Sequence, residues 1–146
     1  MVNPSLQDFI KSVQATNRIT FGDVRRLSRV VLPEGLVSRE DVEPLVELDA
    51  TIARRDPSWT DWLVSAVVDF AVWGERPTGY VEGEAASWLI ETLSRHGMAT
   101  KAARLIVREI EREAEAVDDT ITSLAESFEG LPETPVEEAF VEQVSA

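Results

Sequence analysis

The segment that decides the fold is residues 56–73, DPSWTDWLVSAVVDFAVW. The first helical position needs no amide hydrogen bond, so Asp56-Pro57-Ser58 predicts that a helix begins there. From Trp59 to Trp73, apolar side chains point in almost every direction around the helix. A helix without a polar face is normally buried on all sides, and we therefore expect residues 59–73 to form a buried central helix.

Helical spacing of apolar residues continues on both sides of this segment. Ser5, Thr20 and Ser38 are placed to cap three preceding helices, and Asp41 extends the Ser38 cap into a capping-box variant. A further helix is expected over about 82–96, after the loop 74–79. We predict an all-α compact bundle of about six helices in residues 1–128, built from repeated helix–loop–helix units around residues 59–73.

A long helix is predicted from Thr100 to Phe128. Apolar residues recur there at spacings of three and four, and the second half matches a heptad stripe. This stripe is expected to bind a partner protein or, through 110–128, a second copy of the chain. The stripe consists of Val117, Ile121, Leu124 and Phe128.

Residues 129–146 are expected to be a flexible acidic tail, because they contain five glutamates and no basic residue. Within the tail, Thr134-Pro135 predicts the start of a short helix that carries Val136, Phe140 and Val144 on one face. A helix this short is marginal in water on its own. We expect it to become ordered by docking on a partner, as amphipathic peptides do.

Composition excludes several functions. The 146 residues include 14 basic and 27 acidic side chains, for a net charge of −13. This excludes a non-specific nucleic-acid binder and argues against an anionic membrane as the main partner. There are no cysteines and one histidine, His96, which argues against thiol chemistry and imidazole metal sites. No secretory signal or membrane-length apolar run is apparent, so a cytoplasmic protein is expected.

Catalysis has little support. We find no glycine-rich phosphate loop, nucleophile elbow or metalloprotease motif, and we expect no enzyme. Asp69, inside the most apolar helix, is expected to pair with an arginine such as Arg76 or to face a loop. The alternative is a general acid or base in a small enzyme. The basic cluster of Arg18, Arg25, Arg26 and Arg29 is interpreted as a solvated face balanced by the acidic tail, with a phosphate or acidic-peptide site as the alternative.

A loop-into-helix phrase recurs along the chain. It reads ITFGDVRRL at 19–27, VSREDVEPL at 37–45 and VEGEAASWL at 81–89, with a fainter copy, MATKAARLI, at 98–106. Such repetition predicts a duplicated supersecondary unit. The loops lack the oxygen ligands of an EF-hand at most positions, so an EF-hand is rejected.

The phrase resembles the acidic loops of the tellurite-resistance TerB family, through PEGLVSRE at 33–40 and PTGYVEGE at 77–84. The resemblance covers about residues 18–108 and implies an all-helical domain. It also implies a divalent cation, Ca²⁺ or Mg²⁺, at Glu34, Glu40, Glu82 and Glu84. The alternative is that the acidic residues of the first helical turns only interact with the helix dipole.

Two functions are therefore expected. The first is a non-catalytic protein-interaction module that binds its partner through the long C-terminal helix and the acidic tail. The second, implied by the resemblance, is a divalent-metal-responsive protein of the TerB type that requires no other cofactor.

Overall fold

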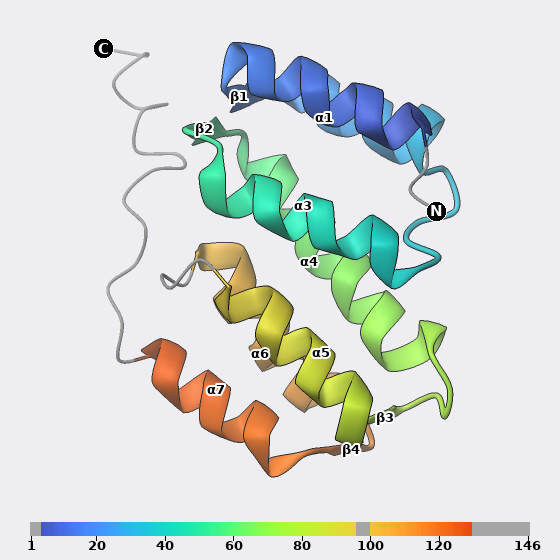
Figure 1. Cartoon of the computed structure of the whole chain (residues 1–146), viewed down its shortest axis with the longest axis vertical. Coiled ribbons are helices and arrows are strands. Elements are labelled where there is room, and N and C mark those ends of the chain that lie inside the picture. The colour runs from blue at the N-terminus through green and yellow to red at the C-terminus, as the bar shows by residue number, and fades with distance from the viewer. Residues whose placement is uncertain (1–3, 96–99, 130–146) are drawn as a thin grey trace.

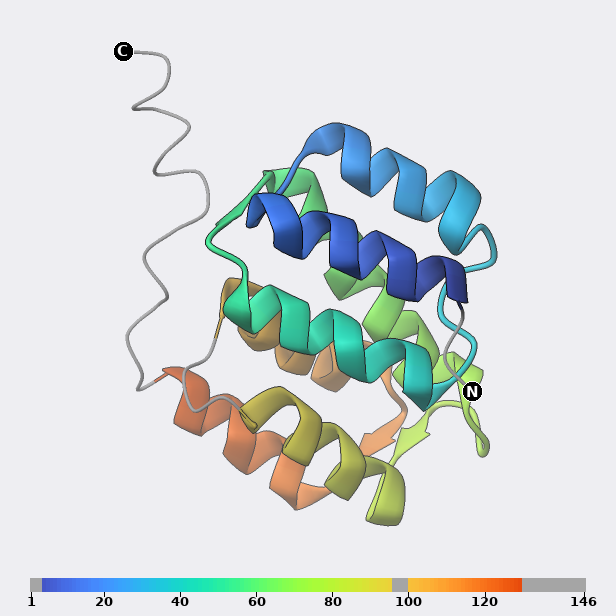
Figure 2. The same cartoon turned by 45° about the horizontal axis from the view of Figure 1, so that its top comes forward.

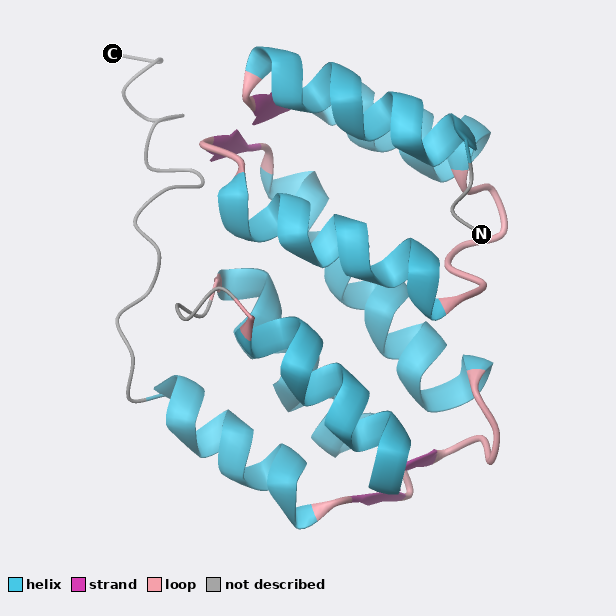
Figure 3. Ribbon diagram, viewed as in Figure 1, coloured by secondary structure: helices cyan, strands magenta, loops and turns pink. Residues whose placement is uncertain are grey.

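The computed structural model describes residues 4–95 and 100–129, which form an all-α domain with short strand bridges (Figures 1 and 3). The all-α prediction is confirmed, with seven α-helices in the described residues rather than about six. No helix in these two ranges is both long enough and apolar enough to cross a membrane. The elements are α1 (Pro4–Thr16), β1 (Arg18–Ile19), α2 (Phe21–Arg26), the π-helix η1 (Leu27–Val31), α3 (Arg39–Thr51), β2 (Arg54–Arg55), α4 (Pro57–Asp69), the π-helix η2 (Phe70–Gly74), β3 (Tyr80–Val81), α5 (Gly83–Ser94), α6 (Lys101–Glu113), β4 (Ala116–Val117) and α7 (Asp119–Glu129).

The helices pack in two layers. Helices α1, α3, α5 and α7 lie side by side in one layer, and α2, α4 and α6 lie in the other (Figures 1 and 2). Helix α4 is the middle helix of the second layer and packs between α2 and α6. The segment predicted to be central therefore occupies the centre of the fold.

The predicted duplication is visible in the structure, with a period of 62 residues. Strand β1 pairs in parallel with β2, and β3 pairs in parallel with β4, each 62 positions later. Helices α3 and α6 differ by the same offset. Asn17 and Gly79, which precede the first strand of each pair, both have a positive φ, of 57° and 88°. The two copies thus share a backbone conformation that their sequences only partly share.

The equivalent turns before α4 and α7 show the same correspondence. The amide of Asp56 donates to the carbonyl of Ile19 at 2.8 Å, and that of Asp118 donates to Val81 at 2.9 Å. Each aspartate then accepts hydrogen bonds from the residue two positions on, Ser58 and Thr120. Helix α4 ends the first unit and, through its second half, begins the next.

The burial of α4 differs from the prediction. Trp59, Leu63 and Val67 are completely buried, but Asp61, Ser65 and Asp69 form an exposed stripe at a spacing of four. Asp69 was expected to pair with an arginine such as Arg76 or to face a loop, and both expectations are wrong, because Asp69 is exposed and lines a cleft beside α6. The layer arrangement is the reason, because helices cover α4 on its α2, α6 and first-layer sides and leave one strip of its surface open.

Helix starts follow the sequence with two exceptions, at Ser5 and Ser38. Ser5 was expected to cap the first helix, and this is wrong, because α1 begins at Pro4 and includes Ser5. Thr20 and Asp23 form a reciprocal capping box, and Asp56 and Thr100 cap α4 and α6 through their side chains. Ser38 occupies the N-cap position of α3, but its side chain makes no capping hydrogen bond. The predicted Ser38–Asp41 capping box is therefore wrong, and Asp41 is instead a buried residue.

The single helix predicted from Thr100 to Phe128 is also wrong. Helix α6 ends at Glu113, the chain extends through β4 to pair with β3, and α7 begins at Asp119. The break reverses the chain so that α7 packs against α5 and α6. Tertiary strand pairing has overridden a local pattern that continues as helix.

The largest buried polar cluster centres on the carboxylate of Asp49, which is 2% exposed. It accepts hydrogen bonds from Trp59 Nε1 at 2.9 Å and from Thr100 Oγ1 at 2.5 Å. Arg55 Nε lies 3.4 Å away as an ion-pair contact, while Arg55 Nη2 donates to the carbonyls of Asp49 and Ile52. Because strand side chains alternate, Arg55 points inward and Arg54 outward. A buried charge requires such partners.

Replacement of Asp49 should be strongly destabilising. Asp49→Ala leaves the Arg55 charge and the Trp59 and Thr100 donors buried without their acceptor, so we expect a loss of about 3 to 5 kcal/mol in the free energy of unfolding. Urea denaturation measures it. Asp8→Ala, an exposed change on α1, should cost less than about 0.5 kcal/mol. Equal effects of the two substitutions would contradict the role given to Asp49.

Candidate functional site

An acidic cleft of about 370 Å³ lies between α4 and α6. Asp61, Ser65 and Asp69 line it from α4, and Glu109 and Glu113 line it from α6. The side chains of Val64, Val68 and Leu105 supply its apolar part. The cleft therefore combines an aliphatic floor with four carboxylates, and no lysine, arginine or histidine lines it among the described residues.

The helical period explains how this cleft is assembled. Residues 61, 65 and 69 of α4, and residues 105, 109 and 113 of α6, each recur at a spacing of four and so lie along one face of their helix. Leu105 and Glu109 are partly buried, whereas Glu113 is exposed. The two stripes face one another because α4 and α6 pack as neighbours in the second layer.

The four carboxylates differ in their partners. Glu109 forms an ion pair with Arg112 at 3.1 Å, one turn along α6. Glu113 accepts a hydrogen bond at 2.7 Å from Nε1 of Trp73, whose side chain is 42% exposed. Within the described ranges, no hydrogen bond or ion pair engages the carboxylates of Asp61 and Asp69. Two negative charges thus face the cleft without a counter-charge.

Other acidic clefts of the domain contain their own cations. The cleft between α1 and α3, which holds Glu40, Glu43 and Glu47, is also lined by Lys11 and Arg95. The cleft at the start of α5 contains Arg39 and Arg76 beside its glutamates. The α4–α6 cleft differs because its charge is not balanced from within.

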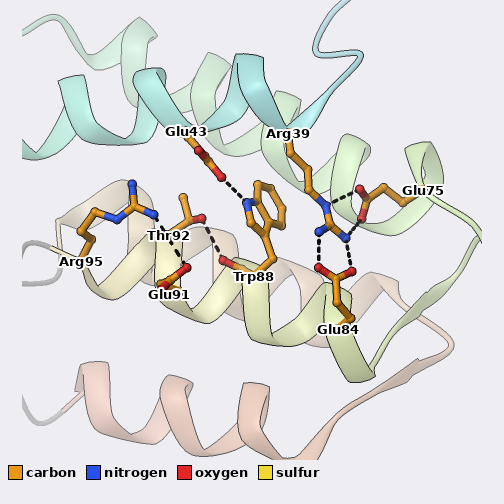
Figure 4. A network of polar contacts seen from close by, with 8 residues as sticks. All are labelled: Arg39, Glu43, Glu75, Glu84, Trp88, Glu91, Thr92 and Arg95. Carbon is orange, nitrogen blue, oxygen red and sulfur yellow. Dashed lines mark hydrogen bonds and ion pairs between the residues drawn. The ribbon is translucent and has the colours of Figure 1, made fainter. Parts of the chain in front are cut away.

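Arg39 joins α3 to α5 and to the segment after η2 (Figure 4). Its guanidinium donates to Glu75 at 2.6 Å and to Glu84 at 2.5 Å, and lies 4.8 Å from the ring centroid of Trp88. Trp88 Nε1 donates to Glu43 at 2.6 Å. The hydrogen bonds that Arg39 donates to Glu84 and then to Glu75 raise the pKa of Arg39, and the bond to Glu84 lowers the pKa of that carboxyl group. Planar, bidentate recognition of this kind suits arginine.

The four glutamates proposed as metal ligands are not gathered at one place. Glu34, Glu40, Glu82 and Glu84 are all exposed, and Glu40 and Glu84 line different clefts. Glu84 is already occupied by Arg39, a cation from the chain itself. No group of three potential metal-binding side chains occurs in residues 4–95 and 100–129. Metal binding stays a prediction.

The predicted partner-binding stripe belongs largely to the protein's own core. Ile121 and Phe128 are 0% and 4% exposed, and Val117 and Leu124 are partly buried against the same core. Helix α7 packs Ile121 and Phe128 into the core against α5 and α6, and Val117 lies on β4. Partner binding through this stripe stays a prediction. The tail residues Val136, Phe140 and Val144, together with His96, lie outside the described residues.

Sequence reasoning missed the cleft, although one half of it was visible. A polar residue at every fourth position of α4 marks a solvent-facing strip even in a very apolar helix. The opposite wall could not be recognised, because the pairing of α4 with α6 depends on tertiary packing.

Comparison of the chain with protein-family models, with curated proteins and with solved structures finds no match. The TerB resemblance accordingly stays a prediction. Function must be argued from the geometry.

The Arg39–Glu84 pair should make stability depend on pH below neutrality. The folded-state pKa of Glu84 lies below its usual 4.5, so the pair stabilises the fold above pH 4.5 and the stabilisation is lost as pH falls through the lower folded value. The melting temperature of Glu84→Gln should therefore be lower than that of the parent at pH 7, and the difference should shrink below pH 4.5. Glu82→Gln removes a nearby exposed charge outside this pair and is the control, for which we expect no such pH-dependent difference. A difference that is constant with pH would contradict the assignment.

Proposed function

We propose that the protein is a non-catalytic interaction module whose α4–α6 cleft binds a cationic amphipathic segment of a partner protein. The observation that carries the proposal is the set of four carboxylates around an aliphatic floor, with no lining cation. The proposed interaction surface is therefore the pair of cleft walls formed by α4 and α6, and not the stripe on α7 that the sequence predicted.

Charge favours a cationic occupant. Asp61 and Asp69 have no partner among the described residues, and the net charge of −13 adds a long-range attraction for positive segments. Exposed charge pairs contribute only modestly to affinity one by one. Their summed field raises association rates and selects the sign of the partner.

Shape favours a helical occupant. The cleft is a groove between two packed helices, and its acidic positions on α4, Asp61 and Asp69, are eight positions apart, or about 12 Å at the rise of an α-helix. This length matches about two turns of a bound helix. Apolar residues of such a helix would contact Val64, Val68 and Leu105, while its lysines or arginines would reach the acidic rim, as in other helix-in-groove complexes.

Binding is proposed in place of catalysis for a geometric reason. Nucleophilic catalysis is recognised by a nucleophile that is hydrogen-bonded to a base, with the base oriented by a third group. Among the described cleft residues, the polar contacts are the Glu109–Arg112 ion pair and the hydrogen bond from Trp73 to Glu113, and neither activates a nucleophile.

A designed cationic peptide tests the proposal. We expect a fluorescently labelled amphipathic helix of lysine and leucine to bind the full chain, with anisotropy that falls as salt rises. A fourfold variant that removes the cleft charges should bind the peptide about tenfold more weakly, at roughly 0.3 to 0.5 kcal/mol for each exposed charge. It combines Asp61→Asn, Asp69→Asn, Glu109→Gln and Glu113→Gln. Trp73 should report binding through its emission, because it donates to Glu113 at the cleft.

The matched control removes the same charge elsewhere. Asp8→Asn, Glu34→Gln, Glu47→Gln and Glu82→Gln are four exposed changes outside the cleft. We expect this variant to retain most of the affinity. If the two fourfold variants lose equal affinity, the peptide responds to net charge alone and the cleft is not the binding site.

A further inference from the structure

Phe21, Arg25 and Arg29 recur at a spacing of four along α2 and η1, with Arg18 on the preceding strand β1 and Val30 next to Arg29. Phe21 and Val30 are 58% and 70% exposed, and Arg25 and Arg29 lie between them in the sequence with exposed side chains. Val24, Leu27 and Val31 are buried and fix the opposite side of the same helical segment. We call the residues Arg18, Phe21, Arg25, Arg29 and Val30 the basic face.

The charges of this face are unbalanced within the described ranges. Arg26, their neighbour, lies 3.9 Å from Asp23, donates to Ser12 and stacks on Phe9. The guanidinium groups of Arg18, Arg25 and Arg29 have no such hydrogen bond, ion pair or ring contact with a described residue. A patch of positive charge beside exposed apolar side chains is unusual on a chain of net charge −13, and it is complementary to an acidic amphipathic segment.

The chain contains a segment of that chemistry. Residues 129–146 include five glutamates and no basic residue, and Val136, Phe140 and Val144 recur at a spacing of four. Such a segment is repelled by the acidic α4–α6 cleft and attracted by the basic face. We propose that residues 134–146 dock as an amphipathic helix on the basic face of the same chain.

Seventeen residues follow the end of α7 at Glu129. Figure 1 shows this end and the β1–β2 pair on the left of the molecule, with α7 and α1 at opposite ends of the long axis. Residues 130–133 in extended form and a helix over 134–146 would together reach about 33 Å. Docking on the basic face therefore requires the segment to run along the long axis toward α2.

Docking within one chain makes a weak contact effective. A short tether holds the segment at a local concentration of the order of millimolar, so the docked state is the more populated one even when the intrinsic affinity is weak. Phe140 would contact Phe21 or Val30, while the glutamates beside it would approach Arg25 and Arg29. The docked segment covers the basic face, and an acidic partner must displace it before binding there.

Paramagnetic broadening in the full chain tests the proposal. The sequence has no cysteine, so Ser145→Cys provides one site for a spin label on ¹⁵N-labelled protein. We expect the amide signals of residues 18–30 to lose at least half of their intensity, and to recover in 1 M salt. Arg25→Glu with Arg29→Glu should abolish the broadening, and Phe140→Ala should reduce it.

Two controls make the result decisive. Arg76→Glu with Arg112→Glu changes the net charge equally at exposed positions outside the basic face and should preserve the broadening. A mixture of spin-labelled ¹⁴N protein with unlabelled ¹⁵N protein should show none. Broadening in the mixture would assign the contact to a second copy and overturn docking within the chain. Absence of broadening at 18–30, or its persistence in Arg25→Glu/Arg29→Glu, would overturn it as well.

Discussion

The fold depends on the buried carboxylate of Asp49, which needs hydrogen-bond donors and a positive charge beside it. Asp49 on α3 receives hydrogen bonds from Trp59 on α4 and Thr100 at the start of α6, and pairs with Arg55 on β2. Thr100 Oγ1 also accepts from the amide of Ala103, so the same hydroxyl begins α6 and attaches it to α3. A buried ion pair of this kind adds little stability compared with an apolar core, but its geometry specifies which elements meet.

Two structural units meet at this point. The 62-residue duplication gives each unit a parallel strand bridge, and α4 belongs to both. The apolar character of α4 follows from this double membership, because one helix supplies core residues to helices on two sides. The α4–α6 cleft lies at the junction of the two units, and both of its walls contribute to the Asp49 cluster, through Trp59 and Thr100. The proposed binding site is therefore held by the same contacts that hold the fold.

Local sequence patterns predicted the structural features that depend only on residues close together in the sequence. The start of α4 at Asp56-Pro57 and the caps at Thr20 and Thr100 follow from side chains that reach their own backbone. Long-range effects were not predictable in this way. Residues 111–117 favour helix, yet pairing of β4 with β3 breaks it. The signal that was missed is Asp118 with Thr120, which repeats the Asp56–Ser58 cap.

The candidate site shows the same division. Asp49 lies on the apolar stripe of α3 beside Leu45 and Leu48, and its position alone indicates a buried carboxylate that needs partners. The identity of those partners required the tertiary arrangement. The acidic strip of α4 could be predicted from the sequence, but not the fact that it faces Glu109 and Glu113 across the cleft.

The shared helix α4 and the Asp49 cluster make the two units one cooperative body. Native-state hydrogen exchange of the full chain in increasing urea tests this most directly. We expect the slowest amides of α3, α4 and α6 to merge into one global opening with a single free energy. If α6 and α7 open together at a clearly lower free energy while α1 to α4 stay protected, the units are separable, and the cleft between α4 and α6 is not a preformed site.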